Sequence, residues 1–322
     1  MKQRILIPVC ALLLVFWSTG CEKIIEFKGE VTDPLLTISA QAEAGEPLEV
    51  YVASSIFFLS DQKGGSAFYE KLDQERGQVR CFVNGSSTAI LLKPDPEELQ
   101  TSLHYVASDY APAPGDHIRI EAEFPGFDPV WGETDVPLMP SFEVVSVKWR
   151  KMTAADEGWI GEVEDDVMEA EITLALTDDA SYKKYYFLQP FAELHYDFMD
   201  ENILVGEDFT SNDVLFQGIG GESALSNFMG TDNFFADDLI KGQRHEFTIK
   251  VSYLSYMPTE MPRLWLHVAA VNESLYWYGK SYDSLAGEFA GLFSEGVTLY
   301  SNVHGGYGVV CAAASLWLDV ER

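Results

Sequence analysis

The side chains that most often carry catalysis are scattered along this chain. No two of its six histidines have the spacing of a metal-binding pair; they are His104, His117, His195, His245, His267 and His304. The sequence also lacks a His-Glu-x-x-His zinc motif, a Gly-x-Ser-x-Gly nucleophile elbow, a phosphate-binding P-loop and an EF-hand loop. A Ser-His-Asp triad assembles only in three dimensions, so the sequence leaves one open. These patterns predict no catalytic residue, no cofactor and no resident metal.

Acidic side chains crowd two stretches that are predicted to be loops. One stretch holds Glu162, Glu164, Asp165, Asp166 and Glu169, and the other holds Asp197, Asp200, Glu201, Glu207 and Asp208. Calcium takes about six to eight oxygen ligands, which such loops could supply. A pair of carboxylates could also hydrolyse a glycoside if they lay about 5–9 Å apart. Solvated loops at the rim of a sheet account for the same composition, and this is the interpretation we adopt.

Aromatic side chains are concentrated near the C-terminus. Flat amphipathic rings serve both as sugar-stacking platforms and as the energetic centres of protein interfaces. Most of these rings should be buried in a core. Trp277 lies off the helical stripe described below, and Tyr307 lies inside the glycine-rich turn HGGYG. We therefore expect these two side chains to face outwards, and they are our candidate binding residues.

The N-terminus has the features of a secretory leader that ends at a cysteine. Lys2 and Arg4 precede an apolar run from Ile5 to Trp17, which is too short for a membrane-spanning helix of roughly 20 residues but fits a signal peptide. The small residues of the stretch STGC then lead directly into Cys21, as in the sites where bacterial lipoproteins are cut and acylated. We predict a signal peptide over residues 1–20, a lipid on Cys21 and a short leader over residues 21–34. The alternative is an ordinary secretory cut beside an unmodified cysteine.

The charge of the chain excludes one large class of partners. The formal net charge is −30, and loss of Lys2 and Arg4 with the leader would make it −32. A chain this acidic repels phosphate backbones, so we expect no nucleic-acid binding. The acids are spread among strand-like runs, and 47% of the residues are hydrophobic, which indicates a solvated surface around a core.

Only two cysteines remain as disulfide partners after the leader and the lipidated position. Cys81 lies in VRCFVN and Cys311 in GVVCAAASLWLDV, and both stretches alternate or run apolar like strands. Buried free thiols behave as small hydrophobic groups. We expect two separate buried thiols, with a disulfide as the alternative.

Short alternating runs separated by turn residues dominate the chain from Leu35 onwards. LTISAQA, LEVYVASS, QVRCFVNG and HIRIEAEF each place apolar residues at every second position. The pattern predicts an all-β fold with two sandwich-like domains, an immunoglobulin-like one over residues 35–140 and a β-rich one over residues 141–322. The segment DVPLMPS, with Pro137 and Pro140, is the predicted linker.

One segment departs from the strand rhythm. From Asn272, a plausible N-cap, apolar residues recur at steps of three and four through Leu275, Tyr278, Tyr282 and Leu285. This predicts one amphipathic helix over residues 272–293, packed with that face against the C-terminal sheet.

Several stretches together resemble a known family of bacterial lipoproteins. They include CEKII, AGEPLEVYVASS, PGDHIRIEAEFPGFDPVWGETDVP, VNESLYWYGKSY and VTLYSNVHGGYGVVCAAASLWLDV. The family is the Bacteroidetes lipoprotein family called domain of unknown function 4249 (DUF4249), and the last stretch is the most specific match. The resemblance implies a β-rich lipoprotein of the outer membrane, commonly encoded beside TonB-dependent receptors, on either the periplasmic or the outer face. It implies no established activity.

The function that these observations favour is binding. We expect an envelope lipoprotein that is not an enzyme and that serves as an accessory or ligand-binding partner of a TonB-dependent outer-membrane transporter. One alternative is a surface or periplasmic hydrolase of glycan or peptide, and another is a structural or adhesion module.

The tether leads to the first prediction. Cys21→Ser should leave the protein without acyl chains and move it from the membrane fraction to the soluble fraction, because stable anchoring needs at least two chains. Fractionation and mass spectrometry of the N-terminal peptide measure this. A wild type that carries no acyl group, and a variant that fractionates unchanged, would contradict the prediction.

Overall fold

A computed structural model describes residues 33–55, 72–95, 102–151, 167–194, 202–216, 233–254, 263–286 and 298–320. Residues Pro34–Arg322 form one compact unit. The predicted signal peptide, Cys21, His195 and most residues of the two acidic stretches lie outside the described residues.

The strands of the first half alternate buried and exposed side chains, as the sequence predicts. β1, for example, buries Leu36, Ile38, Ala40 and Ala42. The strands are β1 (Leu36–Glu43), β2 (Leu48–Ser54), β3 (Gln78–Val83), β4 (Ile90–Leu91), β5 (Lys93–Pro94), β6 (Leu103–Ala107), β7 (His117–Glu123) and β8 (Val130–Asp135).

The second half contains longer strands and the one α-helix among the described residues. Its elements are β9 (Phe142–Lys151), β10 (Val167–Thr177), β11 (Tyr185–Leu194), β12 (Ile203–Gly206), β13 (Phe209–Thr210), η2 (Val214–Phe216), β14 (Phe234–Ala236), η3 (Asp237–Leu239), β15 (Arg244–Leu254), β16 (Arg263–Val271), α4 (Glu273–Ala286) and β17 (Tyr307–Val320). The prediction of an all-β fold with one helix near the C-terminus is confirmed.

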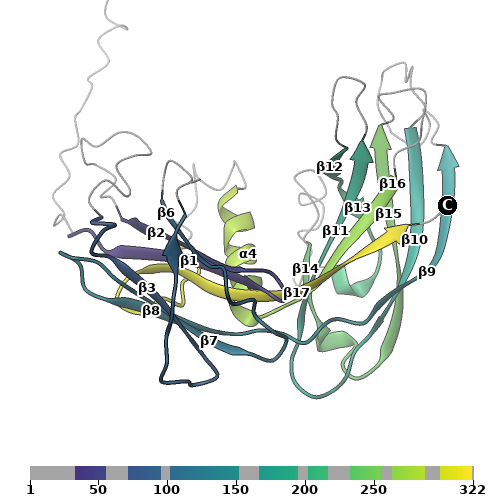
Figure 1. Cartoon of the computed structure of the whole chain (residues 1–322). Coiled ribbons are helices and arrows are strands. Elements are labelled where there is room, and N and C mark those ends of the chain that lie inside the picture. The colour runs from purple at the N-terminus through teal and green to yellow at the C-terminus, as the bar shows by residue number, and fades with distance from the viewer. Residues whose placement is uncertain are drawn as a thin grey trace, which may run out of the picture. The chain divides into compact units, whose positions relative to one another are not determined.

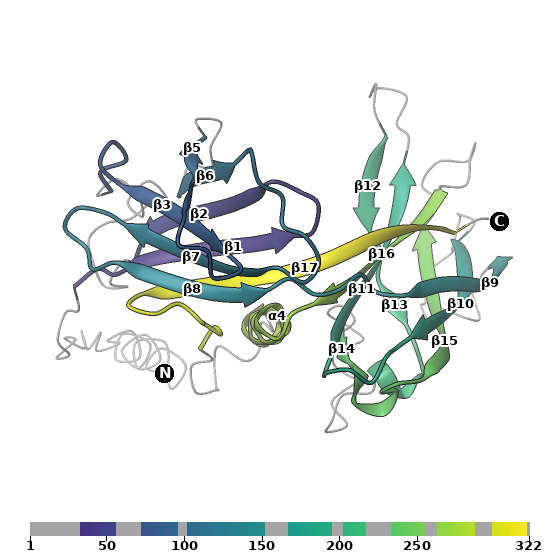
Figure 2. The same ribbon diagram turned by 60° about the horizontal axis from the view of Figure 1, so that its bottom comes forward.

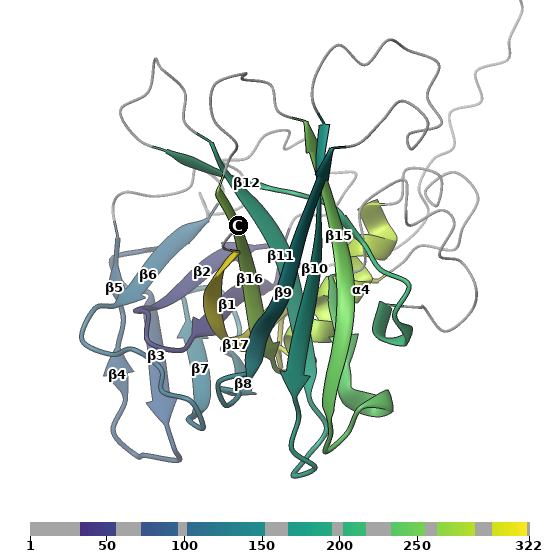
Figure 3. The same cartoon turned by 90° about the vertical axis from the view of Figure 1, so that its right-hand side faces the viewer.

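The described strands form three sheets (Figure 1). The large sheet has the strand order β12-β11-β16-β17-β1-β2-β6-β5, with β14 paired to β11. One small sheet, β4-β3-β7-β8, shares a hydrophobic core with β1, β2 and β6, and we call this pair the N-terminal sandwich. The other small sheet, β13-β15-β10-β9, shares a core with β11 and β16 and forms the C-terminal sandwich, which Figure 3 views from the side of β9, β10 and β15.

Strand β17 belongs to both sandwiches. Its first half, Tyr307 to Ala313, pairs in parallel with β1, and its second half, Ala313 to Val320, pairs antiparallel with β16. Val310 and Ala312 lie in the N-terminal core, whereas Val320 lies in the C-terminal core. The boundary placed near Pro140 by the sequence remains a prediction, but the last strand contributes to the cores on both sides of it.

The glycine-rich turn before β17 is required by a close approach of two backbones. A Cβ atom on Gly306 would lie 2.2 Å from the carbonyl oxygen of Leu36, and Gly308 has a φ of +114°. A side chain at Gly306 would collide with the backbone of β1, and a φ as positive as that of Gly308 is readily adopted only by glycine. The turn therefore lets β17 enter the sheet beside β1.

Two asparagines satisfy the edge of the first half of β17 that faces no strand among the described residues. The side chain of Asn302 accepts a hydrogen bond from the Val310 N–H and donates one to the Val310 carbonyl, both at 2.8 Å. Asn272 accepts from the Ala312 N–H with its side chain at 3.1 Å and donates to the Ala312 carbonyl with its own N–H at 3.0 Å. Buried backbone groups left unpaired are costly, so these amides replace a missing strand.

Helix α4 packs on the large sheet, and Figure 2 looks along its axis. The predicted N-cap is confirmed, because the Asn272 side chain accepts from the Leu275 N–H at 3.0 Å. The predicted buried stripe is partly wrong: Leu275 packs against the sheet, but Tyr282 is 57% exposed and Tyr276 takes a place in the contact. Residues 287–293 of the predicted helix lie outside the described residues.

The predicted separate buried thiols are confirmed. Cys81 and Cys311 are both free and buried, and burial raises the pKa of each thiol to about 12. Neither thiol is therefore poised as a nucleophile.

Two buried aspartates near the start of β11 differ in how well they are satisfied. Asp178 accepts hydrogen bonds from the Tyr186 hydroxyl at 2.8 Å, the Gly242 N–H at 2.7 Å and the Lys184 ammonium at 3.2 Å. Both carboxylate oxygens of Asp237 are buried without a hydrogen-bond partner. Burial, the largest cause, raises the pKa of Asp237, with the nearby charge of Asp178 adding to the shift.

This contrast gives the second prediction. Because the fold raises the pKa of Asp237, ionisation costs stability, and the loss develops as pH rises above the carboxyl's ordinary pKa of 3.8. Asp237→Asn should therefore raise the free energy of unfolding by about 1 kcal/mol or more at neutral pH, and should have little effect once Asp237 is protonated.

Asp178→Asn is the matched control. It weakens a charge-assisted network around a buried carboxylate and should lower the free energy of unfolding by about 2 kcal/mol or more at neutral pH. Denaturant titrations at several pH values measure both variants. If Asp237→Asn destabilised the protein as much as Asp178→Asn, the Asp237 carboxylate would have a partner that this account lacks.

Candidate functional site

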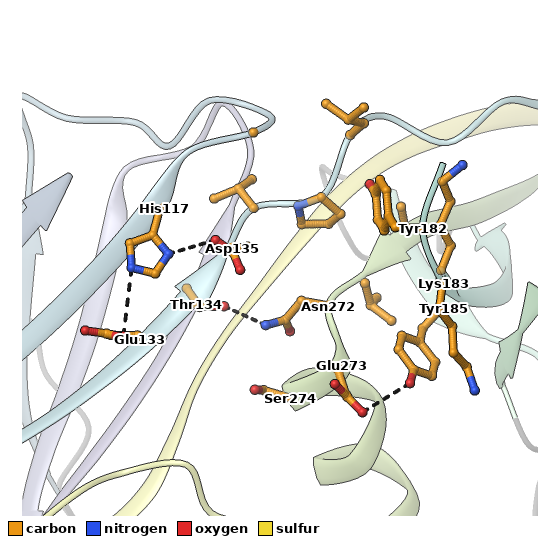
Figure 4. Close-up of a pocket in the computed structure, with 17 residues that line it drawn as sticks. His117, Glu133, Thr134, Asp135, Tyr182, Lys183, Tyr185, Asn272, Glu273 and Ser274 are labelled. Carbon is orange, nitrogen blue, oxygen red and sulfur yellow. Dashed lines mark hydrogen bonds and ion pairs between the residues drawn. The ribbon is translucent and has the colours of Figure 1, made fainter. Parts of the chain in front are cut away.

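A cavity of about 710 Å³ lies among three segments that are far apart in the sequence (Figure 4). The first is the β7–β8 side with the chain that follows it, the second is the approach to β11, and the third is the end of β16 with the first turn of α4. β16 pairs with β17 and leads directly into α4. The shared strand β17 therefore determines where the third segment lies.

Paired ionic side chains form the β7–β8 wall. His117 lies opposite Asp135 in the strand register, and its Nδ1 lies 2.7 Å from Asp135 Oδ1. Alternation places Glu133 on the same face as Asp135. Glu133 accepts a hydrogen bond from Arg119 at 3.0 Å, and the Arg119 guanidinium lies 3.9 Å from the ring centre of Trp131.

Asn272 connects this wall to the helix. Its Nδ2 donates to the Thr134 hydroxyl at 2.6 Å, and Thr134 is buried on β8. The same side chain caps α4 and binds the Ala312 N–H of β17. The Asn272 side chain thus joins β8, β17 and α4. Figure 4 labels Thr134 and Asn272, which both line the cavity.

The first turn of α4 presents a carboxylate bonded to neutral donors. Glu273 accepts from the Tyr185 hydroxyl at 3.3 Å and from the Trp277 indole N–H at 3.2 Å. Burial, followed by the nearby Glu273 charge, raises the pKa of Tyr185 to about 12, so its hydroxyl stays protonated and donates. Trp277 is thereby bonded to a residue that lines the cavity, although it does not line the cavity itself.

The remaining wall carries two lysines whose ion-pair partners are aspartates that do not line the cavity. Lys183 pairs with Asp238 at 3.0 Å, and that contact raises the pKa of the lysine. Lys184 pairs with Asp178 and with Asp179, the latter at 2.8 Å. The Lys183 ammonium lies 5.3 Å from the ring centre of Tyr185, and the Lys184 ammonium lies 5.3 Å from that of Tyr182.

A second cavity of about 250 Å³ adjoins the first. The two share His117 and Glu133, and the smaller one extends over Arg119 and Glu121 on the outer face of β7. We call the two cavities together the groove.

Two described histidines have carboxylate partners. His117 lines the groove beside Asp135, whereas His245, which lies outside the groove, is beside Asp213. Within the described ranges, no three histidine, cysteine or acidic side chains gather where they could hold a metal ion. The groove offers aromatic rings and preformed hydrogen-bonding groups instead.

The two binding residues proposed from the sequence are both exposed, as expected. Trp277 is 44% exposed and touches the cavity through Glu273, whereas Tyr307 is 56% exposed at the start of β17. The cavity itself does not include Tyr307. Cys21 lies outside the described residues.

Sequence reasoning missed the residues that line the groove. The sequence showed His117 only as one of six histidines without metal-binding spacing, and it is the first residue of β7, opposite Asp135. The alternation in HIRIEAEF and WGETDV could have placed His117, Glu133 and Asp135 on one outer face. No local signal indicates that Tyr185 and Glu273, which are 88 residues apart, meet.

Comparison with known proteins assigns the chain to a family. No helix in the described part of the chain is both long and apolar enough to cross a membrane. No curated protein matches the sequence. The family described as "Domain of unknown function (DUF4249)" matches residues 22–316, which is most of the chain and includes every element that builds the groove except the last residues of β17. The protein therefore belongs to the DUF4249 family.

Proposed function

We propose that this protein is a lipid-anchored binding protein of the bacterial outer membrane, that it acts as an accessory of a TonB-dependent transporter, and that it is not an enzyme. The proposed anchor is Cys21, and its support is the short leader that ends in STGC. The family resemblance described from the sequence implies the same location and the same neighbouring receptor.

The observation that carries the binding proposal is the preformed groove. Its polar groups are already fixed by one another, as in the pairs His117–Asp135 and Tyr185–Glu273. A site that is ordered before binding loses little conformational entropy when a ligand arrives. Recognition by a rigid, partly aromatic surface is therefore the activity that this arrangement favours.

Trp277 and Tyr307 are the exposed rings that we expect to meet a partner protein. On β17, Tyr307 projects to the same face as Ala313, because side chains alternate along a strand. Ala313 packs under α4, the helix that carries Trp277. Two exposed rings on one side of the sheet are the kind of residues that dominate protein interfaces.

The experiment is a crosslinked purification from envelopes. Wild-type protein should co-purify with an outer-membrane transporter, and Trp277→Ala combined with Tyr307→Ala should release it, because truncating an interface aromatic costs about 2 kcal/mol or more. The melting temperature should not change, since both side chains are exposed.

Trp317→Ala is the matched control. Trp317 is a tryptophan of similar exposure, 46%, at the other end of β17, and its loss should leave the transporter bound. Two results would contradict the proposal: a wild type that purifies alone after crosslinking, or hydrolytic turnover that disappears when one carboxylate is changed.

A further inference from the structure

A second surface lies on the large sheet, on the face that α4 covers only in part. Along β17, Leu316, Leu318 and Val320 point into the C-terminal core, so Trp317 and Asp319 point to the opposite face. The strand register places His267 beside Trp317 and Trp265 beside Asp319. Phe191 of β11 lies opposite Trp265. Figure 1 shows the end of β17 running past α4 towards the C-terminus.

The rings on this face hold one another in place. The imidazole of His267 stacks on the indole of Trp317, with 4.6 Å between ring centres and 19° between planes. Phe191 lies 5.1 Å from Trp317, and Phe187 meets the edge of His267 at 5.7 Å. Trp317 is nevertheless 46% exposed. We call Phe191, His267 and Trp317 the ring platform.

The ring platform is electrically neutral. Burial lowers the pKa of His267, which favours the uncharged imidazole at neutral pH. The charged groups around it are paired: Arg263 binds Asp319, and its guanidinium lies 4.3 Å from the ring centre of Trp265. Trp265 in turn donates to Glu193 at 2.8 Å. No unpaired charge is presented to a ligand by these residues.

Polar groups stand on two sides of the exposed indole. Asp319 and Arg263 lie on one side, two residues along β17 and one strand across. Ser315 lies on the other side, and its hydroxyl donates to Glu43 at 2.7 Å. Carboxylate, guanidinium and hydroxyl groups at the rim of an aromatic ring match a ligand with one apolar face and hydroxyl groups around its edge.

We propose that the ring platform binds a neutral carbohydrate. The C–H face of a pyranose ring stacks on Trp317, and its hydroxyl groups bond to the rim at Asp319, Arg263 and Ser315. An anionic ligand is disfavoured by the formal net charge of −30.

This site is independent of the groove and of the transporter proposal. The test titrates the full chain with neutral oligosaccharides of differing linkage, namely cellohexaose, maltohexaose, laminarihexaose and mannohexaose, and with anionic oligogalacturonate for comparison. Calorimetry and tryptophan fluorescence report binding. At least one neutral oligosaccharide should bind, and oligogalacturonate should bind more weakly than that sugar.

Variants then locate the site. Trp317→Ala should weaken binding about tenfold or more, whereas Trp317→Phe, which keeps a flat ring, should weaken it less. Tyr282→Ala, which removes an exposed ring that belongs to neither proposed site, should bind as the wild type does. Failure of every neutral sugar to bind would overturn the proposal, as would binding that Tyr282→Ala removes and Trp317→Ala spares. Self-association of the wild type that Trp317→Ala abolishes would assign the face to a second copy of the chain and would also overturn it.

Discussion

The double pairing of β17 is the constraint on which the rest of the structure depends. One strand joins β1 in parallel and β16 antiparallel, with Ala313 as the residue shared by both registers. Each sandwich would lose part of its core without it. The strand must also accept a helix on one face at the point of exchange, which explains why a small side chain occupies Ala313: a larger one would hold α4 away from the sheet.

That constraint also sets the geometry of both proposed surfaces. Asn272 fixes the start of α4 against β17 and reaches Thr134 on β8, so the cavity walls are connected through a single amide. The far half of β17 carries Trp317 on the outer face and presents the ring platform. Both proposed surfaces are therefore connected to the same strand, the groove through Asn272 and the ring platform through Trp317.

The sequence predicted those features that depend on local periodicity. Alternation revealed the strands and the all-β class, and the steps of three and four with Asn272 as N-cap revealed α4. The helix face was partly wrong, because Tyr276 packs where Tyr282 was expected. The aromatic residues of α4 fit two overlapping helical faces, one with Tyr276 and one with Tyr282. Packing against the sheet selects the face with Tyr276, and the spacing of apolar residues in the sequence does not distinguish the two.

Features that depend on long-range pairing could not be predicted in this way. The β1–β17 ladder joins residues about 270 positions apart, and parallel pairing leaves no turn in the sequence to mark it. The run VVCAAAS was interpreted only as a strand; its continuous burial has a second cause, the helix above it. Groove residues such as His117, Asp135 and Tyr185 are polar side chains at the ends of strands. Nothing in the local sequence shows that these strand ends lie close together.

Hydrogen exchange at the backbone amides of β17 tests the central claim most directly. If β17 holds both sandwiches together, the amides of Val310 to Ala314 should exchange only through global unfolding, with the same free energy as core amides such as Ile172 in β10 and Ile120 in β7. Exchange of the β17 amides through a smaller opening, while Ile172 and Ile120 stay protected, would mean that each sandwich stands without the shared strand. That result would contradict the account.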